Sequence, residues 1–213
     1  NFANQGSALQ LAGGFNSGNG YDGSTPVQLA GVANFGWDDS FLQIAGGFNF
    51  AEKRVAFQLA GLFNLGPDQE RDYEIQSPFF QGSVLFNRSE NTPIQMALIN
   101  YSEERTILQI GAANIFQRGN VQIGAYNSGQ LAPGVRMGFM NHGHGGPFQF
   151  AAINIHSSGP AYGVSIGAWN FADEYNGIML GVFNYAKDLD GVQIGLLNIN
   201  RTGTLPVMPL FNF

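Results

Sequence analysis

Short uncharged segments in which apolar and polar residues alternate recur along the whole chain, each built around an asparagine. An apolar pair one residue apart, such as Leu42 and Ile44, comes first; one or two small residues follow, and an apolar residue stands directly before the asparagine. Gln separates the apolar pair in ten of the fourteen units. Most units are 13 to 16 residues apart, and their asparagines are Asn16, Asn34, Asn49, Asn64, Asn87, Asn100, Asn114, Asn127, Asn141, Asn154, Asn170, Asn184, Asn198 and Asn212. We therefore expect residues 1–213 to form a single repeat domain.

Each unit has the two-residue period of a β-strand, which predicts a chain that is nearly all β. The first apolar residue precedes the asparagine by seven positions in the first five units and the last, and by six in the eight between. On a straight strand, the loss of one residue would turn everything beyond it to the opposite face. A corner at the small residues, such as Gly124, removes this conflict. We predict a parallel β-solenoid of about fourteen coils of 13–16 residues, each with two short strands.

In such a solenoid we expect the apolar rows to form the core. For one coil these residues are Val192, Ile194, Leu197 and Ile199, and Trp169 would be a packing residue of another coil. The asparagines would stack from coil to coil with each amide bonded to the next, as side-chain ladders do in stacked β structures. Rows of Gln, Asn and small residues would then line the long outer sides.

The same alternation also fits a 14-stranded outer-membrane β-barrel, because uncharged nine-residue segments in an even number are typical of that fold. Two features favour the solenoid. The long connections, Ser17–Pro26, Leu65–Phe79 and Ile155–Gly163, do not all follow units of one parity, although long barrel loops share one side. Barrel interiors also usually carry charge, which these segments lack.

The composition limits the partners. Only 11% of the residues are charged, the net charge is −6, and there is no cysteine. Nothing is basic enough to attract nucleic acid, so we expect no such partner, and thiolate metal sites are excluded. No apolar run has the length of a membrane-spanning helix. Because the chain starts at Asn1 instead of Met, we expect a removed leader or a fragment.

The units "GVQIGLLNIN" and "LQIGAANIF" and the closing "GTLPVMPLFNF" resemble the surface-repeat proteins of spirochaetes and Bacteroidetes, which carry tandem GxQIGLxN units and are of surface-exposed or lipoprotein type. The resemblance covers nearly the whole chain. It implies export to the bacterial cell surface or outer membrane and no particular reaction. The chain departs from the unit where Gln is usual, at Arg136, Ser165, Met179 and Pro206.

Two groups of residues could hold a metal ion. His142, His144 and His156 could bind Zn²⁺ or Ni²⁺ at one edge, but no carboxylate is placed to orient a ring, and three solvated loop histidines are the interpretation that we favour. Acidic loop residues could share Ca²⁺, but they lack the fixed spacing of calcium-binding repeats, so a solvated acidic edge is favoured; these are Asp38, Asp39, Glu103, Glu104, Asp173, Glu174, Asp188 and Asp190. We expect no metal and no cofactor.

The sequence contains no nucleophile motif, phosphate loop or dinucleotide fingerprint, so we expect no enzyme. We expect instead a structural or interaction protein of the bacterial cell envelope, in which the repeats form a scaffold and the long loops contact an envelope protein or a glycan. A pore or a component of an outer-membrane assembly is the alternative, and membrane association remains open. The candidate contact residues lie in two loops and are Trp37, Asp38, Asp39, Asp68, Glu70, Arg71, Asp72 and Tyr73.

Overall fold

The structure, a computed structural model, describes residues 2–3, 8–18, 24–37, 39–67, 78–132, 134–157 and 159–213. These residues form two compact units, Asn1–Gly111 and Ala112–Phe213. In unit 1, each apolar-Gln-apolar segment forms one strand and each apolar-Asn-apolar segment the next, with a bend at the small residues between them. The strands are β1 (Phe2–Ala3), β2 (Leu9–Ala12), β3 (Phe15–Gly18), β4 (Val27–Ala30), β5 (Ala33–Gly36), β6 (Ser40–Ala45), β7 (Phe48–Ala51), β8 (Val55–Ala60), β9 (Phe63–Leu65), β10 (Phe80–Ser83), β11 (Phe86–Asn91), β12 (Ile94–Met96) and β13 (Ile99–Ile110).

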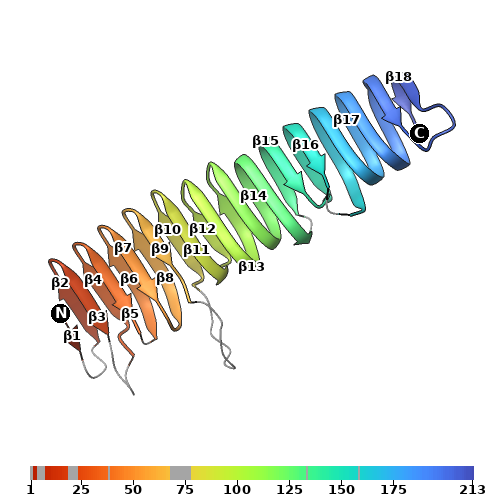
Figure 1. Ribbon diagram of the computed structural model, residues 1–213. Coiled ribbons are helices and arrows are strands. Elements are labelled where there is room, and N and C mark those ends of the chain that lie inside the picture. The colour runs from red at the N-terminus through yellow and green to blue at the C-terminus, as the bar shows by residue number, and fades with distance from the viewer. Residues whose placement is uncertain are drawn as a thin grey trace. The chain divides into compact units, whose positions relative to one another are not determined.

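The strands of unit 1 form two parallel layers. The first layer contains β2, β4, β6, β8, β10 and β12, and the second contains β1, β3, β5, β7, β9, β11 and the start of β13 (Figure 1). Each Gln lies beside the next Gln, as Gln28 does beside Gln43, and each Asn beside the next Asn, as Asn34 does beside Asn49. The expected parallel β-solenoid is confirmed, and the parallel pairing excludes the barrel alternative.

The small residues form a corner between the two strands of each coil, as the spacing predicted. In unit 1 the bends lie at residues 13–14, 31–32, 46–47, 61–62, 84–85 and 97–98. The change from seven to six residues leaves both rows in register, because Gln81 still pairs with Gln95 and Asn87 with Asn100. The corner is tight: a Cβ on Gly46 would lie 2.2 Å from the carbonyl oxygen of Gly31. Glycine therefore fits where the backbone of one coil comes this close to the next, whereas the bends at 84–85 and 97–98 contain no glycine.

Unit 2 repeats the arrangement with strands that continue through the corners. They are β14 (Ala113–Ala132), β15 (Val135–Gly143), β16 (Phe148–His156), β17 (Ala161–Asn200) and β18 (Val207–Asn212). The pairs β14–β15, β15–β16 and β16–β17 are parallel and again place Asn beside Asn. The edge opposite the corners, where the chain passes from one coil to the next, is called the loop edge in both units.

The last repeat differs from the sequence prediction. Strand β18 pairs antiparallel with the end of β17, and Asn212 lies opposite Gln193 instead of Asn198. Asn198 donates its side-chain amide to the carbonyl oxygen of Met208 at 3.3 Å. The expectation that Asn212 continues the asparagine row is therefore wrong. The final strand turns back and covers the last coil, and its Pro209 cannot offer a backbone N–H to a further strand.

The polarity of the coils is also the reverse of the expectation. The Gln and Asn side chains lie between the two layers and are buried, whereas the apolar side chains beside them point outward. In the coil chosen above as an example, Val192 is 38% exposed, Ile194 48% and Leu197 38%. The prediction of apolar core rows was therefore wrong, as was that of outer rows of Gln and Asn. Trp169 is 49% exposed and is not an interior packing residue.

Candidate functional site: a polar interior and an apolar outer surface

Two rows of buried amides hold the coils of unit 1 together. Each Gln donates Nε2–H to Oε1 of the preceding Gln, as Gln43 does to Gln28 at 2.7 Å. Each Asn donates in the opposite direction along the stack, as Asn34 does to Oδ1 of Asn49 at 2.9 Å. The two rows of amide dipoles therefore oppose each other. Since the members between the ends of each row both donate and accept within it, these polar groups can be buried without the penalty of unpaired atoms.

The asparagines also complete the backbone hydrogen bonding at the corners. Asn34 donates to the carbonyl oxygen of Ile44 at 2.8 Å, and Asn49 donates to that of Leu59 at 2.7 Å. These carbonyls belong to the last residues before a corner, where the regular strand ladder ends. In unit 2 the Asn row continues from Asn114 to Asn198 without interruption. The Asn side chain thus provides a hydrogen bond that the backbone near the corner needs, which explains why the Asn position of the repeat varies so little within the chain.

The Gln row of unit 2 is interrupted by a buried arginine. Arg136 lies between Gln122 and Gln149, is fully buried, and donates to the backbone carbonyl oxygens of His142, at 2.8 Å, and His144. Burial lowers the pKa of its guanidinium to about 10. Sequence reasoning noted Arg136 only as a departure from the repeat; the register could have shown that its side chain lies on the same side of the strand as the Gln side chains.

The three histidines do not converge. His142 lies at the surface, where its Nε2 is 3.1 Å from Oγ of Ser157. His156 is buried, with Nε2 3.2 Å from Oγ of Ser165, so the interpretation of three solvated loop histidines is wrong for this residue. Burial, and then the charge of Arg136, lower the pKa of the His156 imidazole to about 3. In the part of the chain that the structure describes, no group of His, Asp or Glu side chains is arranged to hold a metal ion.

Beside His156, unit 2 also has a small apolar interior. Ala161, Ala172, Tyr175, Met179 and Ala186 form this cluster. The ring of Tyr175 lies 5.3 Å from that of His156, and burial raises the pKa of its phenol. A substitution of Gln by Met at residue 179 therefore has a structural explanation, since its neighbours in the interior are apolar.

The outer surface carries the repeated apolar side chains. In the first layer of unit 1 the residues on either side of each Gln point outward, and they are Leu9, Leu11, Val27, Leu29, Leu42, Ile44, Phe57, Leu59, Phe80, Gly82, Ile94 and Met96. None is polar. The corners add exposed apolar side chains, with Val32, Leu62, Val84 and Leu98 in unit 1 and Phe139, Val182 and Leu196 in unit 2. Apolar surface of this extent is uncommon on isolated proteins and usually marks a contact site.

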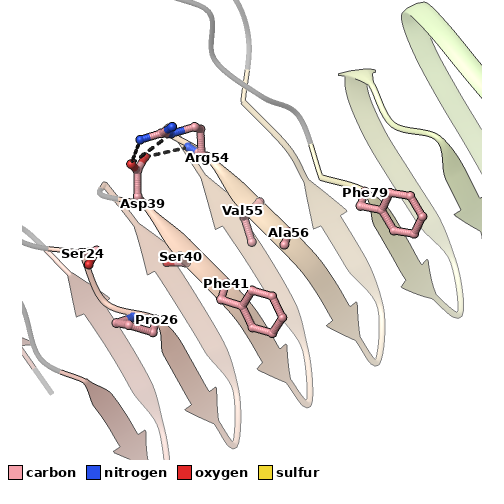
Figure 2. Close-up of a pocket in the computed structure, with 9 residues that line it drawn as sticks. All are labelled: Ser24, Pro26, Asp39, Ser40, Phe41, Arg54, Val55, Ala56 and Phe79. Atoms are coloured by element: carbon pink, nitrogen blue, oxygen red, sulfur yellow. Dashed lines mark hydrogen bonds and ion pairs between the residues drawn. The ribbon is translucent and has the colours of Figure 1, made fainter.

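A shallow groove of about 370 Å³ lies where the first layer of unit 1 meets the loop edge (Figure 2). Phe41 and Phe79 project along it, and the ring of Phe57 lies 5.3 Å from that of Phe41 and 6.0 Å from that of Phe79. At its loop end Arg54 donates through Nε to Asp39 at 3.0 Å, and this bond together with the Asp39 charge raises the pKa of the guanidinium. The groove is therefore apolar along its length and charged at one end.

The candidate contact loops can be placed only in part. Trp37 lies at the loop edge directly after β5, with its ring 5.5 Å from that of Phe50. Asp39 forms the ion pair with Arg54. The remaining residues of this prediction lie outside the described ranges, namely Asp38, Asp68, Glu70, Arg71, Asp72 and Tyr73.

Comparisons of the chain with protein-family models, with curated proteins and with solved structures found no match. The described residues include no helix with the length and hydropathy needed to cross a lipid bilayer. The assignment of a function therefore depends on the chemistry of the surface itself.

Proposed function

We propose that this chain is a non-enzymatic structural or interaction protein of the bacterial cell envelope, in which the coils form a scaffold and the outer apolar faces make the contacts. The observation that carries the proposal is the repetition of outward apolar side chains beside every Gln of the first layer of unit 1. Burying such side chains against a partner is favourable by about 25 cal/mol per Å² of apolar surface. The candidate contact loops add further contacts, with Trp37 and Asp39 as their described members.

The resemblance of the repeats to bacterial surface-repeat proteins supports the envelope as the location. The scaffold role is supported by the interior, where uniform Gln and Asn rows hold each coil against its neighbours. An interaction surface built from repeats is extended and uniform, so its affinity should depend on many weak contacts instead of one pocket.

The experiment is co-sedimentation of the purified protein with isolated bacterial envelopes. A double variant, Ile123→Lys with Met137→Lys, places two charges on an outer face of unit 2, where both side chains are 42% exposed. We expect it to lose about 10-fold or more in binding, because buried unpaired charges are costly. The matched control is Gln117→Lys with Asn120→Lys at the loop edge, where both side chains are exposed. Equal binding of both variants, or no binding by the unaltered protein, would contradict the proposal.

A further inference from the structure

The charges and the apolar side chains of unit 2 lie at different edges. Apart from the buried Arg136, every charged residue of this unit is exposed and belongs to a connection at the loop edge; these are Arg118, Asp173, Glu174, Lys187, Asp188, Asp190 and Arg201. The opposite corner carries Phe139, Val182 and Leu196, of which Phe139 is 64% exposed and Leu196 69%. The coils of this unit are therefore apolar on the first layer and at the corner, mostly apolar on the second layer, where Ser128 and His142 are the polar members directly after the Asn row, and charged on the fourth side.

We infer that each unit inserts corner first into a single leaflet of a lipid bilayer, with the loop edge in the headgroup region and the acyl chains against both outer faces. This inference rests on the proposed function, and it identifies the lipid bilayer as the partner that the outer apolar faces contact. A protein partner or a second copy would cover one flat face, whereas the apolar side chains here continue around the corner onto the opposite face. A fluid of acyl chains covers all three sides at once.

The depth of a coil matches the depth of a leaflet. Strands β4 and β5 of unit 1 have four residues each, and β6 and β8 have six. At about 3.3 Å per residue, a coil extends about 13–20 Å from the loop edge to the corner. The hydrocarbon core of a bilayer is about 30 Å thick, so one leaflet contributes about 15 Å. With the loop edge in the headgroup region, the corner would therefore lie near the bilayer midplane.

The backbone at the corner fulfils the main requirement of a hydrocarbon environment, which is that polar groups are bonded within the protein. In unit 1, Val32 donates its N–H to the carbonyl oxygen of Gly14 at 2.9 Å, and Gly47 donates to that of Val32 at 2.8 Å. The Asn side chains bond the carbonyls just before the corner, as Asn34 does for Ile44. With its amide side chains also turned inward, the coil presents little unpaired polar surface to acyl chains.

The two tryptophans lie at opposite edges of the coils, and Trp37 is placed as this orientation favours. Trp37, 40% exposed, stands at the loop edge of unit 1, the level of the headgroups, where tryptophan is favoured because its ring is apolar and its N–H is polar. Trp169, 49% exposed, lies near the corner of its coil, one residue before the Asn170 of the interior row. The chain contains only these two tryptophans, so each reports the depth of one edge.

The test uses the full chain with phosphatidylcholine vesicles and two single-tryptophan variants, Trp37→Phe and Trp169→Phe. We expect the protein to float with vesicles in a density gradient. Trp169 fluorescence should be quenched at least about twofold more by lipids brominated near the chain ends than by lipids brominated near the headgroup, since the corner would be near the midplane. Trp37 should show the opposite order.

A double variant, Val182→Lys with Leu196→Lys, should lower flotation by about 10-fold or more, because lysine is strongly disfavoured in hydrocarbon. The loop-edge variant Gln117→Lys with Asn120→Lys should float like the unaltered protein, and circular dichroism checks that both variants retain their β structure.

Three results would overturn the inference. The first is no flotation with protein-free vesicles; if the protein still sediments with whole envelopes, the proposed function stands and only the lipid assignment fails. The second is equal quenching depth for the two tryptophans, which means adsorption without insertion. The third is a discrete oligomer in sedimentation velocity that the corner lysines dissociate while flotation is unchanged, which means that a second copy covers the corner.

Discussion

Asn34 donates its side-chain amide to Oδ1 of Asn49 in the next coil at 2.9 Å, and the two side chains are fully buried. The same amide group bonds the carbonyl oxygen of Ile44 at 2.8 Å, at the entrance to the corner. The Asn34 side chain thus joins two neighbouring coils and also provides a hydrogen-bond donor for a backbone carbonyl near the corner of the next coil. The interior Asn row therefore affects the apolar outer surface. A corner whose backbone groups are already hydrogen-bonded can be covered by apolar groups at little cost.

Removal of one asparagine should be costly. Asn127 donates to the carbonyl oxygen of Met137 at 3.0 Å and to Oδ1 of Asn141 at 3.0 Å, and it accepts from Asn114 at 2.9 Å. We expect Asn127→Ala to lower the free energy of unfolding by about 2–4 kcal/mol, because the buried Oδ1 of Asn141 and the carbonyl oxygen of Met137 each lose this donor. Chemical denaturation of the variant measures this change.

The control for this prediction is Asn176→Ala, whose side chain bonds Asp190 in an exposed position. The same change there should cost less than about 1 kcal/mol. If the two substitutions destabilise the protein equally, the buried row does not hold the coils together.

The reversed polarity can be tested at two adjacent residues. Gln58 is buried between Gln43 and Gln81, to which it is bonded at 2.9 and 2.7 Å, whereas Leu59 is 39% exposed. We expect Gln58→Leu to destabilise the protein by about 2–4 kcal/mol because Oε1 of Gln43 loses its donor in the row and Nε2 of Gln81 loses its acceptor. Leu59→Gln should change the free energy of unfolding by less than about 1 kcal/mol. Thermal melts of both variants distinguish this arrangement from an apolar core, for which the order would be reversed.

Arg136→Gln should stabilise unit 2. The change removes a buried cation and restores the Gln row, in which Nε2 of Gln149 now donates to the carbonyl oxygen of Gly134 at 2.9 Å. Replacement of a buried charge by a neutral side chain that fits is often stabilising, by about 1–4 kcal/mol. A higher midpoint in urea is the expected result. A lower midpoint would mean that the hydrogen bonds from Arg136 to His142 and His144 stabilise the protein by more than the burial of the Arg136 charge destabilises it.

Acid should destabilise the protein through His156. Its pKa is about 3 in the folded protein and about 6.5 in the unfolded chain. Between these values the unfolded chain binds more protons, so the contribution of His156 is fully present above pH 6.5 and decreases by about 1.4 kcal/mol per unit as the pH falls toward 3. His156→Asn should flatten this dependence in denaturation curves at several pH values, whereas the surface variant His142→Asn should keep it. An unchanged slope in His156→Asn would assign the acid sensitivity to other groups.

The site was less accessible to sequence reasoning than the fold. His156 was expected in a solvated loop, and Arg136 was noted only as a departure from the repeat. Both side chains point inward, because the register of the neighbouring coils places residue 136 in the Gln row and residue 156 two positions after Asn154. The corner surface was not predicted, since a corner was expected only at the small residues, and Val182 and Leu196 were assigned to no row. Their exposure follows only from the orientation of the strands, which turn the Gln and Asn side chains inward and the apolar side chains outward.

The sequence by itself determined the repeat, the strands and the corner at the small residues, because period and spacing act locally and recur in every unit, and it favoured parallel stacking over a barrel. It could not decide which side of each strand faces inward. Alternation separates Gln58 from Leu59 but is the same for either orientation. Only the tertiary structure decided this: the two layers leave an interior in which amides of successive coils reach one another at hydrogen-bond distance, as Gln28 and Gln43 do at 2.7 Å. Each amide is satisfied there by its equivalent in the next coil, so the polar side chains occupy the interior and the apolar ones form the surface.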